Sequence, residues 1–546
     1  MPSAISARAS LAALIITPLL SAAGAAGAAP DPGGENEELR GEVRRLAALV
    51  EETARRDHEE IAALSHEIAA LKAERSTTTD GAPRAGALSP TSSSPDQALS
   101  RSAQNATAGL TMPAGAASAP DDQGVPRVLQ NSIHRLTLQS ADHQYSIGLT
   151  GDVQIDAGGE VSFRPRSPLA GPQSLSTGVN ARRLRFGIAG TAGPWGFGLV
   201  WDAGNSSDQT AKGIETAQIV FGGFKGTAAE IGYSNTFFTL DQSTSSNDTM
   251  FLERATPSNI ATAFNTGDSR ANAGVRFFGD RYWIGGYLTG PAAGDTHTGA
   301  GERLGAFERA AFQVINRPDG SLHLGLGLDQ LLDAPNAGNG TPETLTLSDQ
   351  PELRVDPTTL LTTGVIGTAA HPVTGGWVAD LETAATWRSL FWQGEAYAYT
   401  VGRRGLGDAS FSGGYGEVAY ALTGERHTYN PQAGSYFRIY PHHPFSITDG
   451  TWGAFEVAAR VSYVDLTSRY LPLVALSANP QAIDGGRQTA YTLGLNWYPN
   501  DIVRILINYG HVELEKANGA VLKGLPLGAP VGARLDSLSL RTQVAF

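Results

Sequence analysis

Two arginines at alternate positions, Arg183 and Arg185, are the first candidates for chemistry in this chain. In an extended strand, residues two positions apart share one face, so both guanidinium groups would lie opposite the apolar side chain of Leu184. A guanidinium is planar, stays charged at every relevant pH and offers a fork of donors that fits an oxyanion. The spacing therefore favours anion binding, with structural ion pairs to carboxylates such as Glu215 and Glu456 as the alternative.

Patterns that would indicate catalysis or a resident metal do not occur in the sequence. The chain has no cysteine, which excludes disulfides, thiolate ligands and cysteine nucleophiles. It has no Walker-type glycine loop for phosphate. The pair His442-His443 precedes a proline and has no carboxylate at metal-ligand spacing, so we interpret it as part of a surface loop. We expect no enzymatic activity, no cofactor and no metal.

The composition is typical of a large antiparallel β-protein that does not bind nucleic acid. Charged residues make up 17% of the chain, which is below the roughly 25% of soluble domains. Glycine is abundant, with 65 residues, and the formal net charge is −13. A protein that binds nucleic acid would instead carry a basic face.

Residues 1–28 are typical of a secretory signal peptide. Arg8 supplies a short positive region, residues 11–20 form an apolar run, and small residues follow with a cleavage pattern at Ala26 and Ala28. The apolar run is shorter than the roughly 20 residues that a membrane-spanning helix needs. We therefore expect export with cleavage rather than an N-terminal anchor.

Residues 36–75 are predicted to form a coiled coil. Apolar residues recur at alternating steps of three and four, with a stutter near Ala54, and charged residues fill the other faces. A helix that is polar on most faces needs a partner, so we favour an oligomerising coiled coil over a single helix that packs elsewhere. Residues 76–130, rich in Ser, Thr, Ala, Gly and Pro, are predicted to be a flexible linker.

From residue 131 to residue 546 the pattern has the period of two that is typical of β-strands. Three segments illustrate it: Trp452–Tyr463, Tyr491–Tyr498 and Val503–Tyr509. Their apolar faces end in Tyr, Trp and Phe, as a membrane-interface girdle requires, and their other faces carry polar and charged residues, as a watery lumen permits. A soluble β-sandwich would also alternate, but it would not require this combination. We therefore predict a transmembrane antiparallel β-barrel, preceded by the coiled coil and linker.

The strand candidates number about sixteen, an even count as in bacterial single-chain barrels. Short turns are predicted at 192–194, 222–226, 279–280, 317–320, 388–389 and 499–501, and we expect them on the periplasmic side. The long polar stretches Asp333–Gly375 and Thr423–Gly450 are expected to be extracellular loops. The last strand candidate alternates and ends in Phe546, like the closing strand of bacterial outer-membrane proteins.

Four sequence strings together resemble the phosphate-selective porins O and P. They are ARRLRFG at 181–187, STSSNDTMFLER at 243–254, WGAFEVAARVSYVDL at 452–466 and GLNWYPNDIVRILINYG at 494–510. The resemblance spans about residues 132–546. It implies a barrel that forms homotrimers in the lipid of the Gram-negative outer membrane, with the coiled coil and linker in the periplasm. It also implies arginines that line the pore and a third loop folded inward at the constriction.

The resemblance also assigns candidate residues to the pore constriction and its anion site. The positions that match the family's motif are Arg182, Arg183, Glu215, Ser245, Ser246 and Arg254, and Arg185 joins them because it shares a strand face with Arg183. Gln242 stands where the family has a selectivity lysine. Lysine is scarce in the whole chain, so this departure weakens the prediction of phosphate selectivity but not that of a porin.

We expect a passive outer-membrane diffusion pore for small anions such as phosphate or other oxyanions. Two alternatives stay open. The acidic net charge and the missing lysine favour a general-diffusion porin of low selectivity. The third hypothesis is a structural tether, in which the coiled coil binds peptidoglycan and the barrel is the anchor. A coiled coil of about 37 residues would reach only about 55 Å at 1.5 Å per residue, and the linker adds to that reach.

Overall fold

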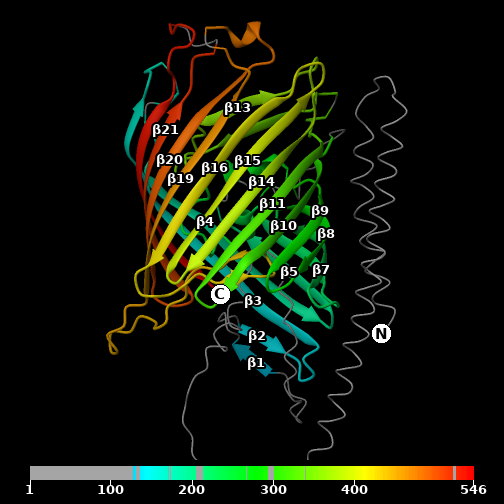
Figure 1. Cartoon of the computed structure of the whole chain (residues 1–546), viewed down its shortest axis with the longest axis vertical. Coiled ribbons are helices and arrows are strands. Elements are labelled where there is room, and N and C mark those ends of the chain that lie inside the picture. The colour runs from blue at the N-terminus through cyan, green and yellow to red at the C-terminus, as the bar shows by residue number, and fades with distance from the viewer. Residues whose placement is uncertain are drawn as a thin grey trace, which may run out of the picture. The chain divides into compact units, whose positions relative to one another are not determined.

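A computed structural model (Figure 1) describes the backbone of residues 127–130 and residues 136–546, apart from gaps at 170, 173, 205–212, 266, 268, 293–300, 339, 472 and 520–523. The predicted signal peptide and coiled coil lie outside these residues, as does nearly all of the predicted linker. Within the described part of the chain, no helix is both long and apolar enough to cross a bilayer.

Sixteen antiparallel strands form a closed barrel within the described residues. They are β3 (Tyr145–Pro165), β4 (Gly178–Ala192), β5 (Trp195–Asp202), β6 (Ile214–Phe221), β7 (Thr227–Ser234), β8 (Arg270–Phe278), β9 (Tyr282–Thr289), β10 (Leu304–Arg317), β11 (Gly320–Asp333), β14 (Val373–Trp387), β15 (Leu390–Arg403), β16 (Ala409–Ala421), β19 (Ala454–Ser468), β20 (Ile483–Tyr498), β21 (Val503–Glu515) and β22 (Ala533–Ala545). Each pairs with the next, and β22 pairs with β3 to close the wall. The predicted barrel is confirmed.

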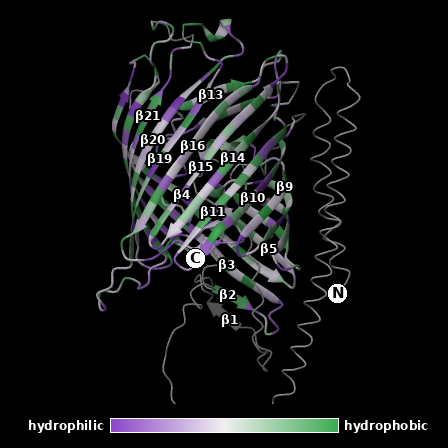
Figure 2. Cartoon of the chain, in the orientation of Figure 1, coloured by the Kyte–Doolittle hydropathy of each residue, from purple (hydrophilic) through white to green (hydrophobic). Residues whose placement is uncertain are grey.

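The two faces of the wall differ as the alternation predicts. On β20, the side chain of Leu493 is 59% exposed on the outside, whereas Asn496 is fully buried. On β22, Leu538 is 50% exposed and Arg541 is fully buried. Figure 2 shows hydrophobic residues along the strands of the wall. The apolar side chains therefore face outward, where a membrane barrel needs them, rather than into a water-soluble core.

Exposed aromatic residues lie near both ends of the barrel. Trp195, Trp387 and Tyr420 stand next to the short turns, whereas Trp201 and Tyr463 lie toward the opposite ends of their strands. Aromatic rings of this kind sit at membrane–water interfaces because one part of the ring system is apolar and another can bind water. The two girdles mark the outer edges of the apolar band.

The six predicted short turns all connect consecutive strands, and they lie at one end of the barrel, which we call the short-turn end. The prediction for Thr423–Gly450 is wrong, because this stretch also belongs to the short-turn end. β16 runs toward that end, and the backbone N–H of Phe445 donates to the carbonyl of Pro499, which lies in a short turn. Length alone did not reveal the side, because this long connection folds back into the barrel.

Loop 3, residues 235–269 between β7 and β8, is packed against the inside of the wall. It contains the short helices α4 (Leu240–Ser243) and α5 (Thr256–Phe264). Ile260 and Phe264 of α5 belong to an apolar cluster with wall residues such as Val378 and Tyr399. α5 begins with a proline in its first turn, where the missing N–H costs nothing. The two hairpin strands β12 (Leu345–Asp349) and β13 (Leu361–Ile366) contribute to the same cluster.

The segment 422–453, between β16 and β19, enters the barrel from the short-turn end and contacts loop 3. It includes the two-residue strands β17 (Tyr429–Asn430) and β18 (Ser435–Tyr436). The Ser435 hydroxyl donates to the carbonyl of Ser243 at 2.9 Å. Gly434 has a φ of 62° and an added Cβ would meet the side chain of Trp283 at 2.9 Å, so glycine suits this close approach.

The C-terminal residue, Phe546, lies against the first part of β3. Next to it is a small hairpin of β1 (Arg127–Gln130) and β2 (Leu136–Gln139). Phe546 and Gly151 exchange both backbone hydrogen bonds at 2.9 Å. A Cβ on Gly151 would meet the Phe546 ring at 2.5 Å, so the absence of a side chain lets the ring lie over the strand. β2 pairs with β3 just beyond this point, from Thr137↔Gly148 to Gln139↔Ser146.

Candidate anion site on the inner wall

A β-bulge in β4 turns three arginines toward the lumen. Along β3, Gln154 pairs with Arg183 and Ile155 pairs with Ala181, so Arg182 is the extra residue of β4. A bulge of this kind breaks the strict alternation of faces. Arg182, Arg183 and Arg185 are consequently all buried on the inner side, with exposed fractions of 2%, 7% and 6%.

Arg182 and Arg185 are held by carboxylates. Arg182 forms a two-pronged pair with Glu253 of loop 3, with Nε–Oε1 at 2.7 Å and Nη2–Oε2 at 3.1 Å. Arg185 pairs with Asp202 at 2.9 Å and with Glu215 at 2.8 Å. These contacts match the structural pairing alternative for these two arginines, and Glu215 supplies one of the carboxylates that the sequence suggested.

Arg183 differs from its neighbours because no carboxylate of the described residues lies within ion-pair distance. Its Nη1 donates to Gln154 Oε1 at 2.9 Å, and its buried Nε has no hydrogen-bond partner. The buried hydroxyl of Ser246 also lacks a partner. Arg182, Arg183, Ser246 and Arg254 line one cavity, together with Glu253. The cavity therefore offers unsatisfied donors, which is what an incoming anion requires.

Arg254 and Ser245 are engaged within loop 3. Arg254 Nη1 pairs with the carboxylate of Asp241 at 3.0 Å and also donates to its carbonyl, while Nη2 donates to the carbonyl of Thr244 at 2.9 Å. Ser245 Oγ accepts from the backbone N–H of Asn247 at 3.2 Å. Arg254 thus shapes the loop and presents its charge to the cavity, whereas Ser245 does not line that cavity.

Gln242 is fully buried and lies away from the cavity. Its Nε2 donates to Asn235 Oδ1 at 2.6 Å, and its backbone N–H donates to the Thr239 hydroxyl at the start of α4 at 2.9 Å. The residue at the family's lysine position therefore packs inside loop 3. The structure brings together Arg182, Arg183, Ser246 and Arg254, and it leaves Arg185, Glu215, Gln242 and Ser245 outside the cavity lining.

Glu253 is the main residue that the sequence analysis missed. Besides Arg182, it meets Arg541 of β22 at 3.1 Å and Arg354 at 3.8 Å. Burial alone would raise the pKa of Glu253, but Arg182, Arg541 and Arg354 outweigh it and hold this pKa well below its usual range. The sequence contained one signal for this arrangement, since Arg541 lies on the polar face of the last strand. Glu253 itself stands in a loop, where no periodicity reveals its direction.

Another arginine, Arg309 of β10, joins loop 3 to the segment 422–453. Its Nη1 donates to Ser243 Oγ and to the carbonyl of Ala433, both at 2.9 Å, and its Nη2 donates to the carbonyl of Gly434 at 2.7 Å. Arg309 also pairs with Glu382 of β14 at 3.0 Å. Two chain segments that enter from opposite ends of the barrel are therefore held by one side chain.

A family model for the phosphate-selective porins O and P matches residues 150–546 of the chain. The chain belongs to this family. The match begins within β3 and covers the rest of the barrel, and it begins after the predicted coiled coil and linker. The protein is accordingly a porin, an outer-membrane diffusion pore of the Gram-negative type.

Two curated relatives of this porin are similar over most of their length. A protein of Caulobacter vibrioides without a described function is 26% identical over 491 residues, which are 84% of this chain and 86% of the relative. Porin O of Pseudomonas aeruginosa is 22% identical over 393 residues, which are 70% of this chain and 86% of the relative.

Solved structures of outer-membrane proteins are similar to the porin in fold. The outer membrane protein OmpT of Vibrio cholerae has a TM-score of 0.44 at 10% identity, covering 74% of this chain and 98% of that one. An anion-selective porin from Comamonas acidovorans has a TM-score of 0.42 at 13% identity, covering 74% of this chain and 100% of that one.

Proposed function

We propose that this porin is a passive pore for small anionic solutes, such as phosphate or other oxyanions, and that Arg183 is the residue that favours them. Passive conduction needs sites that attract an ion but release it again. Arg183 meets this requirement, because a neutral amide rather than a carboxylate holds its guanidinium. Ser246, in the same cavity lining, adds a hydroxyl that can donate to an oxyanion.

The arrangement of charges supports a role for this cavity in attracting anions. Arg182 and Arg541 are buried on the inner face near Arg183, and they share the carboxylate of Glu253. Such pairs fix the arginine wall without adding much net charge. An anion that enters the cavity would then meet the charge of Arg183 directly, together with that of Arg254.

A general-diffusion porin of low selectivity is the second candidate. Two observations favour it: Gln242 replaces the family's lysine and is buried within loop 3, and the inner wall carries the carboxylates Asp380, Glu382 and Glu395. Acidic side chains in a lumen favour cations. The balance between these carboxylates and the arginines of β4 determines the ion selectivity of the pore.

Reversal potentials of the purified porin in planar bilayers under a salt gradient separate the two candidates. We expect anion preference for the unaltered protein and a lower anion preference for Arg183→Gln. Arg317→Gln is the matched control, because Arg317 is exposed at the end of β10, next to a short turn. Cation preference of the unaltered protein would refute the anion proposal, and unchanged selectivity in Arg183→Gln would refute the role of Arg183.

We also propose a homotrimer, as the family resemblance implies, and a periplasmic role for residues 36–75. If the coiled coil helps the trimer, its deletion lowers trimer stability in native gels. If it tethers the barrel to peptidoglycan, the deletion instead reduces the amount of porin recovered with isolated cell wall. Unchanged migration and unchanged recovery would contradict both roles.

A further inference from the structure

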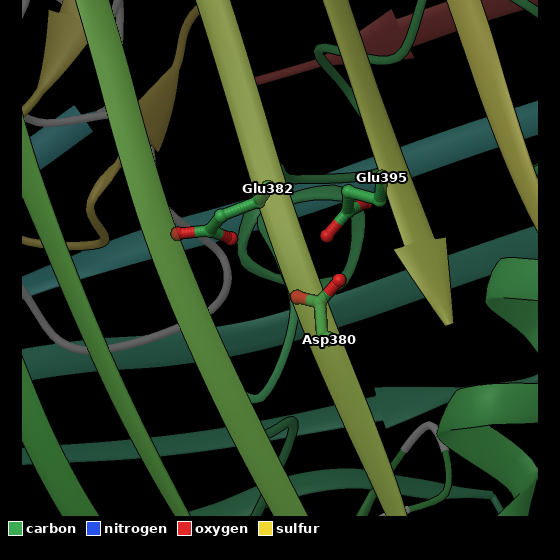
Figure 3. A group of neighbouring side chains, drawn as sticks. All are labelled: Asp380, Glu382 and Glu395. Atoms are coloured by element: carbon green, nitrogen blue, oxygen red, sulfur yellow. The ribbon is translucent and has the colours of Figure 1, made fainter. Parts of the chain in front are cut away.

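Three carboxylates gather on the inner wall at β14 and β15, remote in sequence from the arginines of β4. Asp380, Glu382 and Glu395 are 4%, 0% and 4% exposed, and each offers an oxygen within 4.8 Å of the others. Figure 3 shows Asp380 and Glu382 on one strand and Glu395 on the next. Glu382 and Glu395 are direct partners in the strand register. Like charges at directly opposed positions destabilise a sheet, so the cluster needs a counter-charge.

The described positive groups balance only part of this charge. Glu382 receives Arg309 at 3.0 Å and His323 Nε2 at 3.1 Å. Glu395 accepts hydrogen bonds from the backbone N–H groups of Leu240 and Asp241 at 2.6 and 3.0 Å and from the Tyr415 hydroxyl at 2.6 Å. These neutral donors stabilise the carboxylate of Glu395 but bring no full positive charge.

The hydrogen bonding of Asp380 is a second observation that points to a missing partner. Both of its carboxylate oxygens are buried and have no hydrogen-bond donor among the described residues. A buried carboxylate without a donor or counter-ion is costly, so native proteins pair such a group, protonate it or use it to bind a ligand. Because its neighbours are two further carboxylates, the missing partner is either a cation or a proton shared with one of them.

We propose that Asp380, Glu382 and Glu395 bind a hard divalent cation of the Ca²⁺ or Mg²⁺ class. Carboxylate oxygens are the preferred ligands of these ions, and no thiolate is present in the chain. One divalent ion together with Arg309 balances the three negative charges. Ca²⁺ suits the site better than Mg²⁺, since its coordination tolerates irregular geometry whereas Mg²⁺ requires a near-ideal octahedron.

The cation would also hold loop 3 in place. Glu395 receives the backbone N–H groups at the start of α4, so it anchors the part of loop 3 that precedes the arginine-lined cavity. A bound ion fixes the direction of that carboxylate, as second-shell contacts do in other metal sites. The test of this role does not depend on the solute that the pore conducts.

Terbium luminescence of the full-length porin in detergent, after removal of metals with a chelator, tests the proposal. Tb³⁺ in the site would be excited through Tyr415, whose hydroxyl contacts Glu395. We expect a signal that Ca²⁺ displaces, and at least a tenfold weaker Ca²⁺ competition in Asp380→Asn. Asp152→Asn is the matched control, because Asp152 is also buried on the inner wall but lies on β3. Heat-modifiable migration on gels verifies that each variant is a folded barrel.

Calorimetric titration with Ca²⁺ is a second measurement, made on the unaltered porin and on both variants. A site of one ion per chain, lost in Asp380→Asn and kept in Asp152→Asn, supports the proposal. Absence of Ca²⁺ and Mg²⁺ binding in the unaltered protein overturns it, and so does equal binding in both variants. If the unaltered protein binds neither ion, a proton shared between Asp380 and Glu395 would be the counter-charge.

Discussion

Replacing Glu253 by glutamine should detach loop 3 from the arginine wall. Glu253 is 4% exposed and its carboxylate is shared by Arg182, Arg541 and Arg354, which come from β4, from β22 and from the connection between β11 and β14. The substitution keeps the size of the side chain and one acceptor oxygen but removes the negative charge. It thereby leaves buried guanidinium groups facing one another.

The free-energy cost of this substitution follows from the burial of the Arg182–Glu253 ion pair. Removing one partner of a buried ion pair costs about 3–5 kcal/mol, and every 1.4 kcal/mol is about a tenfold change in an equilibrium. The exposed fractions of Arg182 and Glu253 are 2% and 4%, so solvent screens the pair little. The population of porin with a detached loop 3 should therefore rise by roughly a hundredfold or more.

Hydrogen exchange of backbone amides, resolved by mass spectrometry, measures this population. Amides of α4 and α5 should exchange at least about a hundredfold faster in Glu253→Gln, while those of the wall strands keep their protection. Glu308→Gln is the control, since Glu308 lies on the outer face of β10, away from loop 3, and accepts a hydrogen bond from Gln330. Equal exchange of the loop amides in both variants would refute the view that this carboxylate fastens the loop.

Three further predictions concern the wall and the effect of pH. Deleting Phe546 should impair assembly, seen as loss of the heat-modifiable folded band, because its ring packs over Gly151 and its backbone closes onto β3; normal yield would contradict this. Leu493→Arg should destabilise the membrane-inserted barrel by about 2–4 kcal/mol if this position lies near the bilayer midplane, measured by urea titration in lipid, and an unchanged midpoint would place the residue outside the apolar band. The depressed pKa of Glu253 means that its stabilisation is complete above about pH 4.3 and is lost as the pH falls through its lower folded value. Single-channel noise from loop 3 should therefore stay constant from pH 7 to about pH 4.5 and rise only in stronger acid; a rise near pH 6 would contradict the assignment.

The wall was predictable because its pattern is local. Alternation alone indicates which side of β20 carries Leu493 and which carries Asn496, and the short turns separate the strands. Arg182 shows the limit of this reasoning, because a period of two puts it on the lipid side. Only the pairing of β3 with β4 reveals the bulge that turns it inward.

The interior was predictable only in part, because it depends on contacts between distant segments. Nothing in the sequence of 422–453 tells that it returns into the barrel to meet Ser243. The carboxylate cluster is a different case. The predicted turn at Arg388-Ser389 fixes the register of β14 and β15, so counting back from it places Glu382 opposite Glu395. That signal is present in the sequence.

One edge of β3 pairs in turn with β22, with Phe546 and with β2, and this limits where a label can be attached to the porin. β22 occupies that edge down to Asp152, Phe546 follows opposite Gly151, and β2 holds it from Gly148 onward. Continuing the register beyond Phe546, a third appended residue would face Gly148, which Thr137 already pairs with. A C-terminal affinity tag that continued in this register would consequently displace the β1–β2 hairpin. The side chain of Ile447, 85% exposed in the segment 422–453, marks a better place for an inserted epitope.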